Sequence, residues 1–354
     1  MTGDTRMSTV QTAEAACPAC GEVVYPGEDF CEACGHRLGD SPPAPPPAAG
    51  PPARACAHCG EPAVDDEGYC GHCGLKQPAE RDHLEIELPG QAAVGVSDRG
   101  RRYPRNEDYL ALAACSPHLI GVVCDGVGSS PHPDAASRAA AEAGAAALRD
   151  RLAAGDDPAA ATRAAALHAA RAVAALAPSP ADAPSCTYVS AVASPGQVTV
   201  GWVGDSRVYW VAASEPPPRD PEDTEDTSAL TGSRQLTDDD SWAALMVARG
   251  ALSEAEAEAH PNAHVITAWL GADADEVEPH VRTFSVDRPG TVVVCSDGLW
   301  NYLPDAAALR AAAGSPATPL DAARALVGHA LEAGGRDNIT VTLLPVTATN
   351  GVRP

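Results

Sequence analysis

The sequence is poor in basic residues and in aromatic residues. It contains 24 Lys and Arg against 48 Asp and Glu, which gives a formal net charge of −24. Proteins that hold nucleic acid or anionic lipid regardless of sequence rely on clustered Lys and Arg, so this balance argues against both kinds of ligand. It favours cations, or basic and phosphorylated partners. Aromatic residues make up only 4% of the chain, so we expect a core built from Val, Leu and Ala rather than from rings.

Long apolar segments are also missing. No apolar run approaches the roughly 20 residues that span a bilayer. The N-terminus carries Thr, Asp and Glu and lacks the apolar stretch of a signal peptide. We therefore expect a soluble, cytoplasmic protein. Its 354 residues exceed the length of one ordinary domain, which predicts two or three domains.

Cysteine is present, in an arrangement that argues against a secreted disulfide scaffold. Eight of the 12 cysteines lie before residue 75 in paired Cys-x-x-Cys motifs, and the first four recur 39 positions later as the second four. Two such motifs supply the four thiolates of a structural zinc site, which can hold together a module too small to fold on its own core. Disulfides are disfavoured in a reducing compartment, and a redox thiol pair would not need eight cysteines. The predicted ligands of two structural Zn²⁺ ions are Cys17, Cys20, Cys31, Cys34, Cys56, Cys59, Cys70 and Cys73.

The composition divides the chain into modules. A polyproline spacer, Ser41–Pro47, separates the two cysteine-rich repeats and is expected to be semi-rigid. The predicted boundaries are a first ribbon over 14–38, a Pro-rich linker over 39–54, a second ribbon over 55–77, a linker over 78–90, a large domain over 91–347 and a tail over 348–354.

The large domain shows both strand and helix patterns. Strands are predicted over 92–97, 109–114, 119–124, 187–193, 198–203, 207–211, 281–284, 291–296 and 339–344. Helices are predicted over 134–153, 157–177, 240–250, 305–313 and 319–333. Helices come in adjacent pairs and strands in groups without crossovers, which favours antiparallel sheets covered by helices over a doubly wound parallel sheet. The acidic insertion Glu215–Leu230 is expected to be a mobile surface loop.

Two apolar runs end in an Asp-Gly pair, at Asp125-Gly126 and at Asp297-Gly298. A buried strand delivers its last side chain to the rim of the core, and the glycine allows the backbone to approach a ligand closely. Other acidic residues stand in similar turns, at 106–108, 204–207 and 334–338. Any one of them is ordinary turn chemistry. Together they predict a metal site, because clustered carboxylates raise one another's pKa unless a cation neutralises them, and oxygen ligands suit Mg²⁺ or Mn²⁺.

A series of motifs then shows a family resemblance. In chain order these are Asn106-Glu107-Asp108, Asp125-Gly126, Ser185-Cys186-Thr187, Gly204-Asp205-Ser206-Arg207, Leu236-Thr237 with Asp239, His260-Pro261 through Leu270-Gly271, Ser296-Asp297-Gly298-Leu299 and Gly335-Arg336-Asp337-Asn338. With them, residues 92–346 resemble a metal-dependent protein Ser/Thr phosphatase of the type 2C (PPM) family, bacterial type. The N-terminal region resembles the bacterial double zinc ribbon. The resemblance implies an α+β fold, a four-layer α-β-β-α sandwich of two antiparallel sheets between helix pairs, preceded by two small four-cysteine zinc ribbons.

The resemblance also implies roles for individual residues. The catalytic set would be Asp108, Asp125, Asp297 and Asp337, around two Mn²⁺ or Mg²⁺ ions and a third, weaker one. Asp125 would bridge the two ions with the Gly126 carbonyl as a further ligand, Asp297 and Asp337 would complete one ion, and Glu107 and Asp108 the other. Asp205 would help the third ion, and Asn338 would orient Asp337. A water bridging the two ions would attack phosphoserine or phosphothreonine directly, without a covalent intermediate.

Three positions depart from the family pattern. Tyr103 replaces a phosphate-binding Arg, for which Arg102 or Arg105 is the candidate substitute. Val127 stands where some members have a His that serves as general acid, and Asn301 where many have an Asp that favours the third metal.

Two functions compete on this basis. The first is an active phosphatase acting on the phosphorylated protein substrates of a Ser/Thr kinase, with the zinc ribbons as a docking or regulatory module. The alternative is a catalytically weak pseudophosphatase that binds phosphoproteins as a scaffold. We expect the ribbons to recognise protein rather than nucleic acid, because their flanks carry more Asp and Glu than Lys and Arg.

Overall fold

A computed structural model describes residues 15–25, 28–38, 56, 59–65, 68–75, 77, 80–90, 93–215, 228–274 and 276–347. The chain divides into two units, Met1–Lys76 and Gln77–Pro354. The predicted Pro-rich linker with its spacer, the predicted tail and residues 216–227 of the acidic insertion lie outside the described residues.

The first unit is built from repeated tight turns. Its named strands are β1 (Ala15–Ala16) and β2 (Val23–Val24), which pair antiparallel. In each Cys-x-x-Cys turn the N–H of the first cysteine donates to the carbonyl five residues on, and the N–H of the following glycine donates back to the first cysteine. These glycines have positive φ and are Gly21, Gly35, Gly60 and Gly74. The buried apolar cluster of the first ribbon consists of Cys17, Val24 and Cys31, which is too few side chains to stabilise a fold without a further cross-link.

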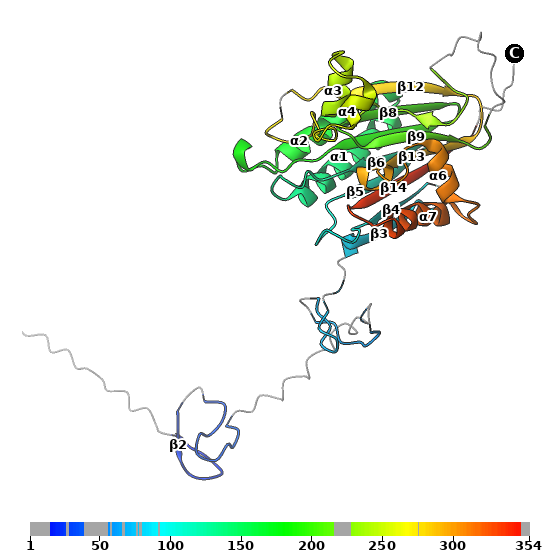
Figure 1. The fold of residues 1–354 in the computed structure, drawn as a ribbon. Coiled ribbons are helices and arrows are strands. Elements are labelled where there is room, and N and C mark those ends of the chain that lie inside the picture. Colours follow the sequence, from blue (N-terminus) through cyan, green and yellow to red (C-terminus); the bar gives the residue numbers. More distant parts are fainter. Residues whose placement is uncertain are drawn as a thin grey trace, which may run out of the picture. The chain divides into compact units, whose positions relative to one another are not determined.

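The second unit contains two six-stranded sheets packed face to face (Figure 1). The first sheet has the order β10 (Ala229–Leu230), β12 (His280–Val286), β8 (Gln197–Val203), β7 (Tyr188–Ser194), β6 (His118–Cys124) and β5 (Tyr109–Cys115). The second has the order β11 (Arg234–Gln235), β9 (Arg207–Ala212), β13 (Gly290–Cys295), β14 (Ile339–Val346), β4 (Val94–Asp98) and β3 (His83–Glu87). The pairings are antiparallel except for β10 with β12, which is parallel. That short edge pair departs from the expectation of two purely antiparallel sheets.

Helices cover both outer faces. The first sheet is covered by α1 (Pro133–Ala153) and α2 (Pro158–Ala174), and the second by α5 (Asp297–Trp300), α6 (Ala306–Ala313) and α7 (Pro319–Glu332). Two shorter helices, α3 (Trp242–Ala248) and α4 (Glu254–Glu258), pack on each other. The remaining elements are the 3-10 turns η1 (Glu80–Asp82) and η2 (Pro180–Asp182). One apolar layer lies between the sheets and one lies under each helix layer, so the predicted four-layer α-β-β-α sandwich is confirmed.

The core is mainly Val, Ala and Leu, as the composition predicts, with a few large rings at its centre. Trp202 and Trp210 are fully buried between the sheets, and Tyr188 and Tyr209 are fully buried beneath the helix layers. The expectation of a core without rings is therefore wrong for these four positions. One aromatic side chain fills a large volume, so a few of them are enough to fill the space that small neighbouring side chains leave.

Residues 83–87, which the sequence led us to place in a linker, form the edge strand β3. It pairs with β4 with His83 opposite Asp98. Leu84 and Ile86 pack against the layer between the sheets, while the side chains between them remain polar. The large unit therefore begins before the predicted boundary at residue 91. Within the described residues, no helix has the length and apolar character that crossing a membrane requires.

Candidate functional site

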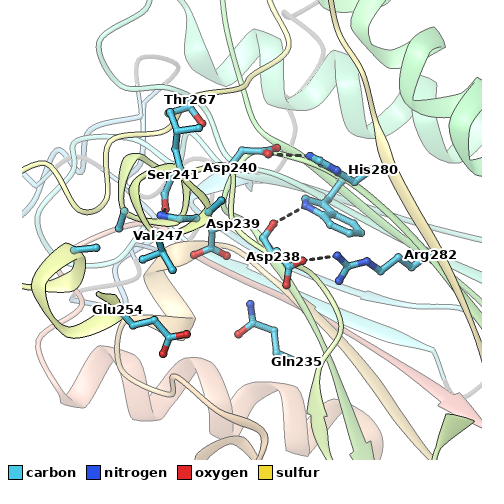
Figure 2. Close-up of a pocket in the computed structure, with 16 residues that line it drawn as sticks. Gln235, Asp238, Asp239, Asp240, Ser241, Val247, Glu254, Thr267, His280 and Arg282 are labelled. Atoms are coloured by element: carbon cyan, nitrogen blue, oxygen red, sulfur yellow. Dashed lines mark hydrogen bonds and ion pairs between the residues drawn. The ribbon is translucent and has the colours of Figure 1, made fainter. Parts of the chain in front are cut away.

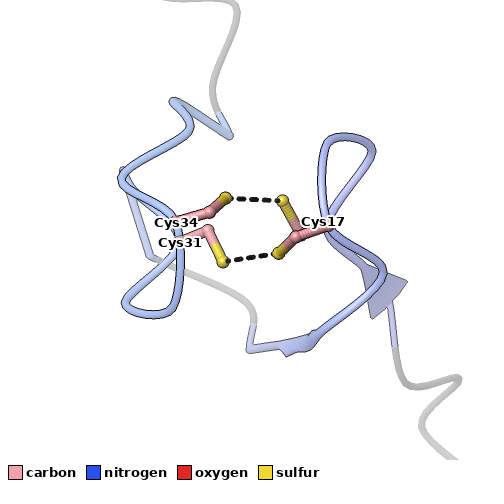
Figure 3. A group of neighbouring side chains, drawn as sticks. Cys17, Cys31 and Cys34 are labelled. Atoms are coloured by element: carbon pink, nitrogen blue, oxygen red, sulfur yellow. Dashed lines mark hydrogen bonds between the residues drawn. The ribbon is translucent and has the colours of Figure 1, made fainter.

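The cysteine motifs bring their sulfur atoms together in two groups of four. Within each group the Sγ atoms lie within 4.8 Å of one another. The Sγ atoms of Cys17 and Cys34 are 3.7 Å apart and those of Cys20 and Cys31 are 3.6 Å apart; Figure 3 shows the first group. The second group repeats these separations, at 3.6 Å for Cys56 with Cys73 and 3.7 Å for Cys59 with Cys70. None of these eight described cysteines forms a disulfide bond.

These separations fit a tetrahedral zinc site. Four sulfurs at a Zn–S distance of about 2.3 Å lie roughly 3.8 Å from one another, whereas disulfide-bonded sulfurs lie about 2.05 Å apart. The cysteine groups therefore match the predicted ligand sets in number, chemistry and spacing.

The strand-end carboxylates meet at one edge of the sandwich because of the strand register. Tyr109 of β5 lies opposite Cys124 of β6, so Asp108 precedes one strand where Asp125 follows its partner. Cys295 of β13 lies opposite Val341 of β14, which brings Asp297 and Asp337 to the corresponding edge of the other sheet. Asp205 lies between β8 and β9, where the chain passes from the first sheet to the second.

A cavity of about 180 Å³ lies between these strand ends. Five acidic residues line it, namely Glu107, Asp125, Asp205, Asp297 and Asp337. Asp108 is buried, with only 1% of its surface exposed. Among the described residues, three or more potential ligand atoms lie within 4.8 Å of one another only in the two cysteine groups, so the carboxylates surround the cavity rather than converge on one point.

Burial and mutual repulsion raise the pKa of these acids. Burial, followed by the charges of Asp108 and Asp297, raises the pKa of Asp125 well above its usual range. Burial and then Asp297 raise the pKa of Asp205 to about 8 and that of Asp337 to about 7. Burial also raises the pKa of Asp108 to about 6. The cluster is thus costly to ionise unless positive charge enters the cavity.

Two of the buried carboxylates each keep one bare oxygen. Ser296 Oγ donates to Asp108 Oδ2 at 2.7 Å, whereas Asp108 Oδ1 has no hydrogen-bond partner. Asn301 Nδ2 donates to Asp297 Oδ2 at 3.4 Å, and Asp297 Oδ1 likewise has no partner. Buried polar atoms are rarely left in this state. Bare carboxylate oxygens around a cavity fit a hard divalent cation such as Mn²⁺ or Mg²⁺.

Gly126 lies where the backbone of several segments converges. A Cβ at this position would lie 2.7 Å from the Pro133 carbonyl oxygen and 2.8 Å from that of Glu107, so only glycine is accommodated. Thr187 Oγ1 accepts a hydrogen bond from Asp125 N at 3.0 Å, and Thr187 N donates to the Asp125 carbonyl at 2.8 Å. The Ser185-Cys186-Thr187 motif therefore supports the loop that carries Asp125.

Asn338 links two of the acidic segments. Its Oδ1 accepts from Glu107 N at 2.7 Å, and its backbone N–H donates to Asp337 Oδ1 at 2.8 Å. Its Nδ2 donates to the carbonyls of Arg99 and Arg105 at 2.7 and 3.2 Å. The side chain thus fixes the loop before Glu107, and the backbone contacts Asp337.

The candidate phosphate-binding arginines do not line the cavity. Arg105 forms ion pairs with Glu107 at 3.4 Å and with Asp134 at 3.5 Å. Arg102 is exposed. Tyr103, the residue that departs from the family pattern, does line the cavity, as does Val127.

Sequence reasoning missed His264, which also lines this cavity. Its ring lies 6.1 Å from that of Trp300, and its charge lowers the pKa of Asp297 against the larger effect of burial. His264 lies inside the His260–Gly271 motif, and this position was the only, weak indication in the sequence that it belongs to the site. Only the fold shows that this stretch reaches the strand-end cavity.

A larger cavity of about 640 Å³ lies beside α3, α4, β8 and β12 (Figure 2). Three consecutive carboxylates line it, but each has a partner. Asp238 pairs with Arg282, Asp239 pairs with Arg207 at 2.7 Å, and Asp240 contacts His280 at 2.9 Å. Each of these three carboxylates thus has a side-chain partner within the fold, whereas Asp297 Oδ1 in the strand-end cavity has none.

Comparison with known families agrees with this geometry. The family model of protein phosphatase 2C matches residues 95–325, and that of the double zinc ribbon matches residues 17–74.

Individual relatives are moderately similar. The chain is 31% identical over 159 residues to the serine/threonine phosphatase stp of Listeria innocua, a match that covers 45% of this chain and 55% of the relative. The chain thus spans about half the length of the curated relatives it matches.

Two solved structures share the fold over most of their own length. The Ser-Thr phosphatase MsPP of Mycobacterium smegmatis, in complex with cacodylate, is 29% identical with a TM-score of 0.54 and matches 72% of this chain and 98% of that one. The catalytic domain of PstP in complex with two manganese ions is 25% identical with a TM-score of 0.50 and matches 72% and 97%. From the matched residues and the shared fold, we conclude that this chain belongs to the protein phosphatase 2C family.

Proposed function

We propose that this protein is a metal-dependent phosphatase that hydrolyses phosphoserine and phosphothreonine in proteins. The observation that carries the proposal is the ring of buried and half-buried carboxylates around one cavity, together with the oxygens of Asp108 and Asp297 that have no hydrogen-bond partner. The names of the relatives support the substrate class, since the Listeria protein is a serine/threonine phosphatase.

The residues divide between two cations. Asp125 with Asp297 and Asp337 would hold one Mn²⁺ or Mg²⁺ ion, and Asp125 with Asp108, Glu107 and the Gly126 carbonyl would hold the other. Asp205 would help to hold a third. When bound, such ions supply a water of lowered pKa and screen the phosphoryl oxygens. The likeness to a PstP domain with two manganese ions supports the pair.

Direct hydrolysis is favoured over a cysteine nucleophile. Cys124, Cys186 and Cys295 are fully buried. Burial raises the pKa of the Cys124 and Cys295 thiols, which suppresses the reactive thiolate. No cysteine is among the described residues that line the cavity. The nucleophile in this proposal is a water molecule activated by the cations, with no covalent intermediate.

The double zinc ribbon serves as a docking or regulatory module in this proposal, held by two structural Zn²⁺ ions. Among the residues that the structure describes, five of the eight exposed large apolar side chains lie in the ribbons: Val23, Tyr25, Phe30, Tyr69 and Leu75. Phe30 and Tyr69 occupy equivalent positions of the 39-residue repeat. Exposed rings of this kind support protein binding, and reduced thiols fit the expected cytoplasmic location.

The direct test of the catalytic proposal is hydrolysis of p-nitrophenyl phosphate by the full chain. We expect turnover that depends on Mn²⁺ and that falls at least a thousandfold in Asp125→Ala. Absence of turnover at saturating Mn²⁺, or equal turnover in the variant, would instead support the pseudophosphatase alternative.

The docking role of the ribbons is tested by the double variant Phe30→Ala with Tyr69→Ala. This variant should leave the hydrolysis of p-nitrophenyl phosphate unchanged and weaken capture of a phosphoprotein. Unchanged capture would contradict the docking role.

A further inference from the structure

The residues that lead from the cysteine-rich unit into β3 contact the Asn106–Asp108 motif directly. The Asn106 N–H donates to Asp82 Oδ1 at 3.3 Å, and Asn106 Nδ2 donates to the Arg81 carbonyl at 3.0 Å. The Asp82 carbonyl also accepts from Arg99 N at 2.8 Å. The backbone of η1 is thus joined to the loop that precedes the predicted metal ligands.

Asn106 also contacts Asp108 and so links η1 to this residue. The Asn106 Oδ1 atom accepts from Asp108 N at 3.2 Å. Asn106 Nδ2 also donates to Ser97 Oγ at 2.8 Å. Asn106, Asp108 and Ser97 are each 1% exposed, so water cannot easily replace a lost bond. One amide side chain therefore connects η1, β4 and the Asp108 backbone.

The Arg81 side chain makes a second connection, to the Glu107 segment. Its Nη1 donates to Asp134 Oδ2 at 3.0 Å and its Nη2 to the Asp134 carbonyl at 3.4 Å. That same carbonyl accepts from Ser137 Oγ at 3.2 Å, and Ser137 Oγ also donates to the Glu107 carbonyl.

We propose that Arg81 and Asp82 are positioning residues for the divalent-cation site, holding Asp108 through Asn106 and Glu107 through the start of α1. Neither residue lines the cavity, and both precede the residues matched by the phosphatase family model. The segment that directly follows the cysteine-rich unit is therefore part of the support of the active site. The inference rests on the proposed function for the presence of a divalent-cation site, whereas its readout, the affinity for Mn²⁺, is independent of catalysis.

The test uses the full, zinc-loaded chain with four variants. Arg81→Ala and Asp82→Ala each remove one connection. Asp82→Asn keeps an oxygen that can accept from Asn106 N. Glu87→Ala, at the far end of β3, is the matched control because this exposed carboxylate lies outside the network. Mn²⁺ affinity is measured by calorimetry, and folding without Mn²⁺ by tryptophan fluorescence.

We expect Arg81→Ala and Asp82→Ala to weaken Mn²⁺ binding about tenfold, as is usual when a supporting partner of a metal ligand is lost. Asp82→Asn should stay within about threefold of the wild type, and Glu87→Ala should match it. Unchanged Mn²⁺ affinity in Arg81→Ala and Asp82→Ala, or a loss of thermal stability without any change in affinity, would overturn the inference. A wild type that binds Mn²⁺ but does not hydrolyse p-nitrophenyl phosphate would refute the proposed function and leave this inference intact.

Discussion

At Asp125, burial and the neighbouring negative charges both oppose ionisation of the side chain. Its pKa is raised well above the usual range by burial and then by the neighbouring charges of Asp108 and Asp297. In the absence of a cation, ionisation at this position destabilises the fold. A neutral side chain of the same shape should relieve that cost while removing a metal ligand.

We therefore expect Asp125→Asn to raise the melting temperature of Mn²⁺-free protein by roughly 3 °C, equivalent to about 1 kcal/mol in a domain of this size. The same change should abolish the further stabilisation that Mn²⁺ gives the wild type. Tryptophan fluorescence during thermal unfolding measures both. Asp150→Asn is the control, because Asp150 is an exposed carboxylate on α1 with 68% of its side chain accessible. An unchanged or lower melting temperature in Asp125→Asn would contradict the repulsion.

The raised pKa values also predict an unusual pH dependence without cations. The folded state raises the pKa of Asp108 to about 6, of Asp337 to about 7 and of Asp205 to about 8. Between the unfolded value of about 4 and these values, the folded state binds more protons than the unfolded chain, so stability falls as pH rises. We expect the Mn²⁺-free melting temperature to drop by several degrees between pH 5.5 and 8.5, and saturating Mn²⁺ to remove the drop. A flat or rising Mn²⁺-free profile would show that the acids are not perturbed.

Gly298 is constrained by packing rather than by a metal role. A Cβ here would lie 1.8 Å from the Asn338 carbonyl oxygen, so Gly298→Ala must push β14 and α5 apart. We expect a loss of roughly 3 kcal/mol, measured by urea unfolding. Gly328→Ala is the matched control, since its Cβ meets nothing within 4 Å in α7, and it should stabilise by about 0.5–1 kcal/mol. Equal effects of the two substitutions would contradict this account.

At the scale of elements, we expect the two ribbons to need a metal ion to fold and the sandwich to fold without one. The buried apolar cluster of the first ribbon is limited to Cys17, Val24 and Cys31. All five tryptophans lie within residues 202–300, so their fluorescence reports only the large unit. Cys31→Ser should therefore reduce bound zinc from two ions per chain to one and collapse the amide NMR dispersion of residues 15–38. The tryptophan melting curve should stay within about 1 °C, and a ribbon that remains folded without its zinc would contradict the prediction.

The sequence best predicted the helices and strands that have a strong apolar or alanine-rich pattern. Apolar runs located the central strands, such as β6 and β13, and alanine-rich stretches located α1 and α2. Strand β3 was missed because His83–Glu87 alternates polar and apolar side chains at a sheet edge, where half the residues face water. Helix α5 was missed because its four residues are too few to show a period.

The same distinction applies to the site. The order of the motifs indicated the acidic residues, because each motif is local in the sequence. His264, Arg81 and Asp82 were missed because their roles depend on contacts between distant segments. Arg81 lies 53 positions from Asp134, and no pattern in the sequence alone joins these two residues. The departure at Tyr103 was visible in the sequence, but its place in the cavity lining required the fold.

At the scale of the whole molecule, the protein carries a net charge of −24, so its negative charge affects how it can bind an anionic substrate. A phosphorylated protein segment is itself anionic, and the cavity that would receive it is ringed with carboxylates. Without cations, substrate and cavity repel each other. Divalent ions would make the charge of the cavity positive and would also supply the activated water. Substrate binding and turnover should therefore depend on the cation concentration in the same way.

The most direct measurement is the release of inorganic phosphate from a phosphothreonine peptide by the full chain, as Mn²⁺ is titrated into protein freed of divalent ions other than zinc. The account predicts no release without Mn²⁺, and a saturable rise that follows Mn²⁺ occupancy measured by calorimetry. Release that is independent of Mn²⁺, or no release once the cation sites are filled, would contradict it.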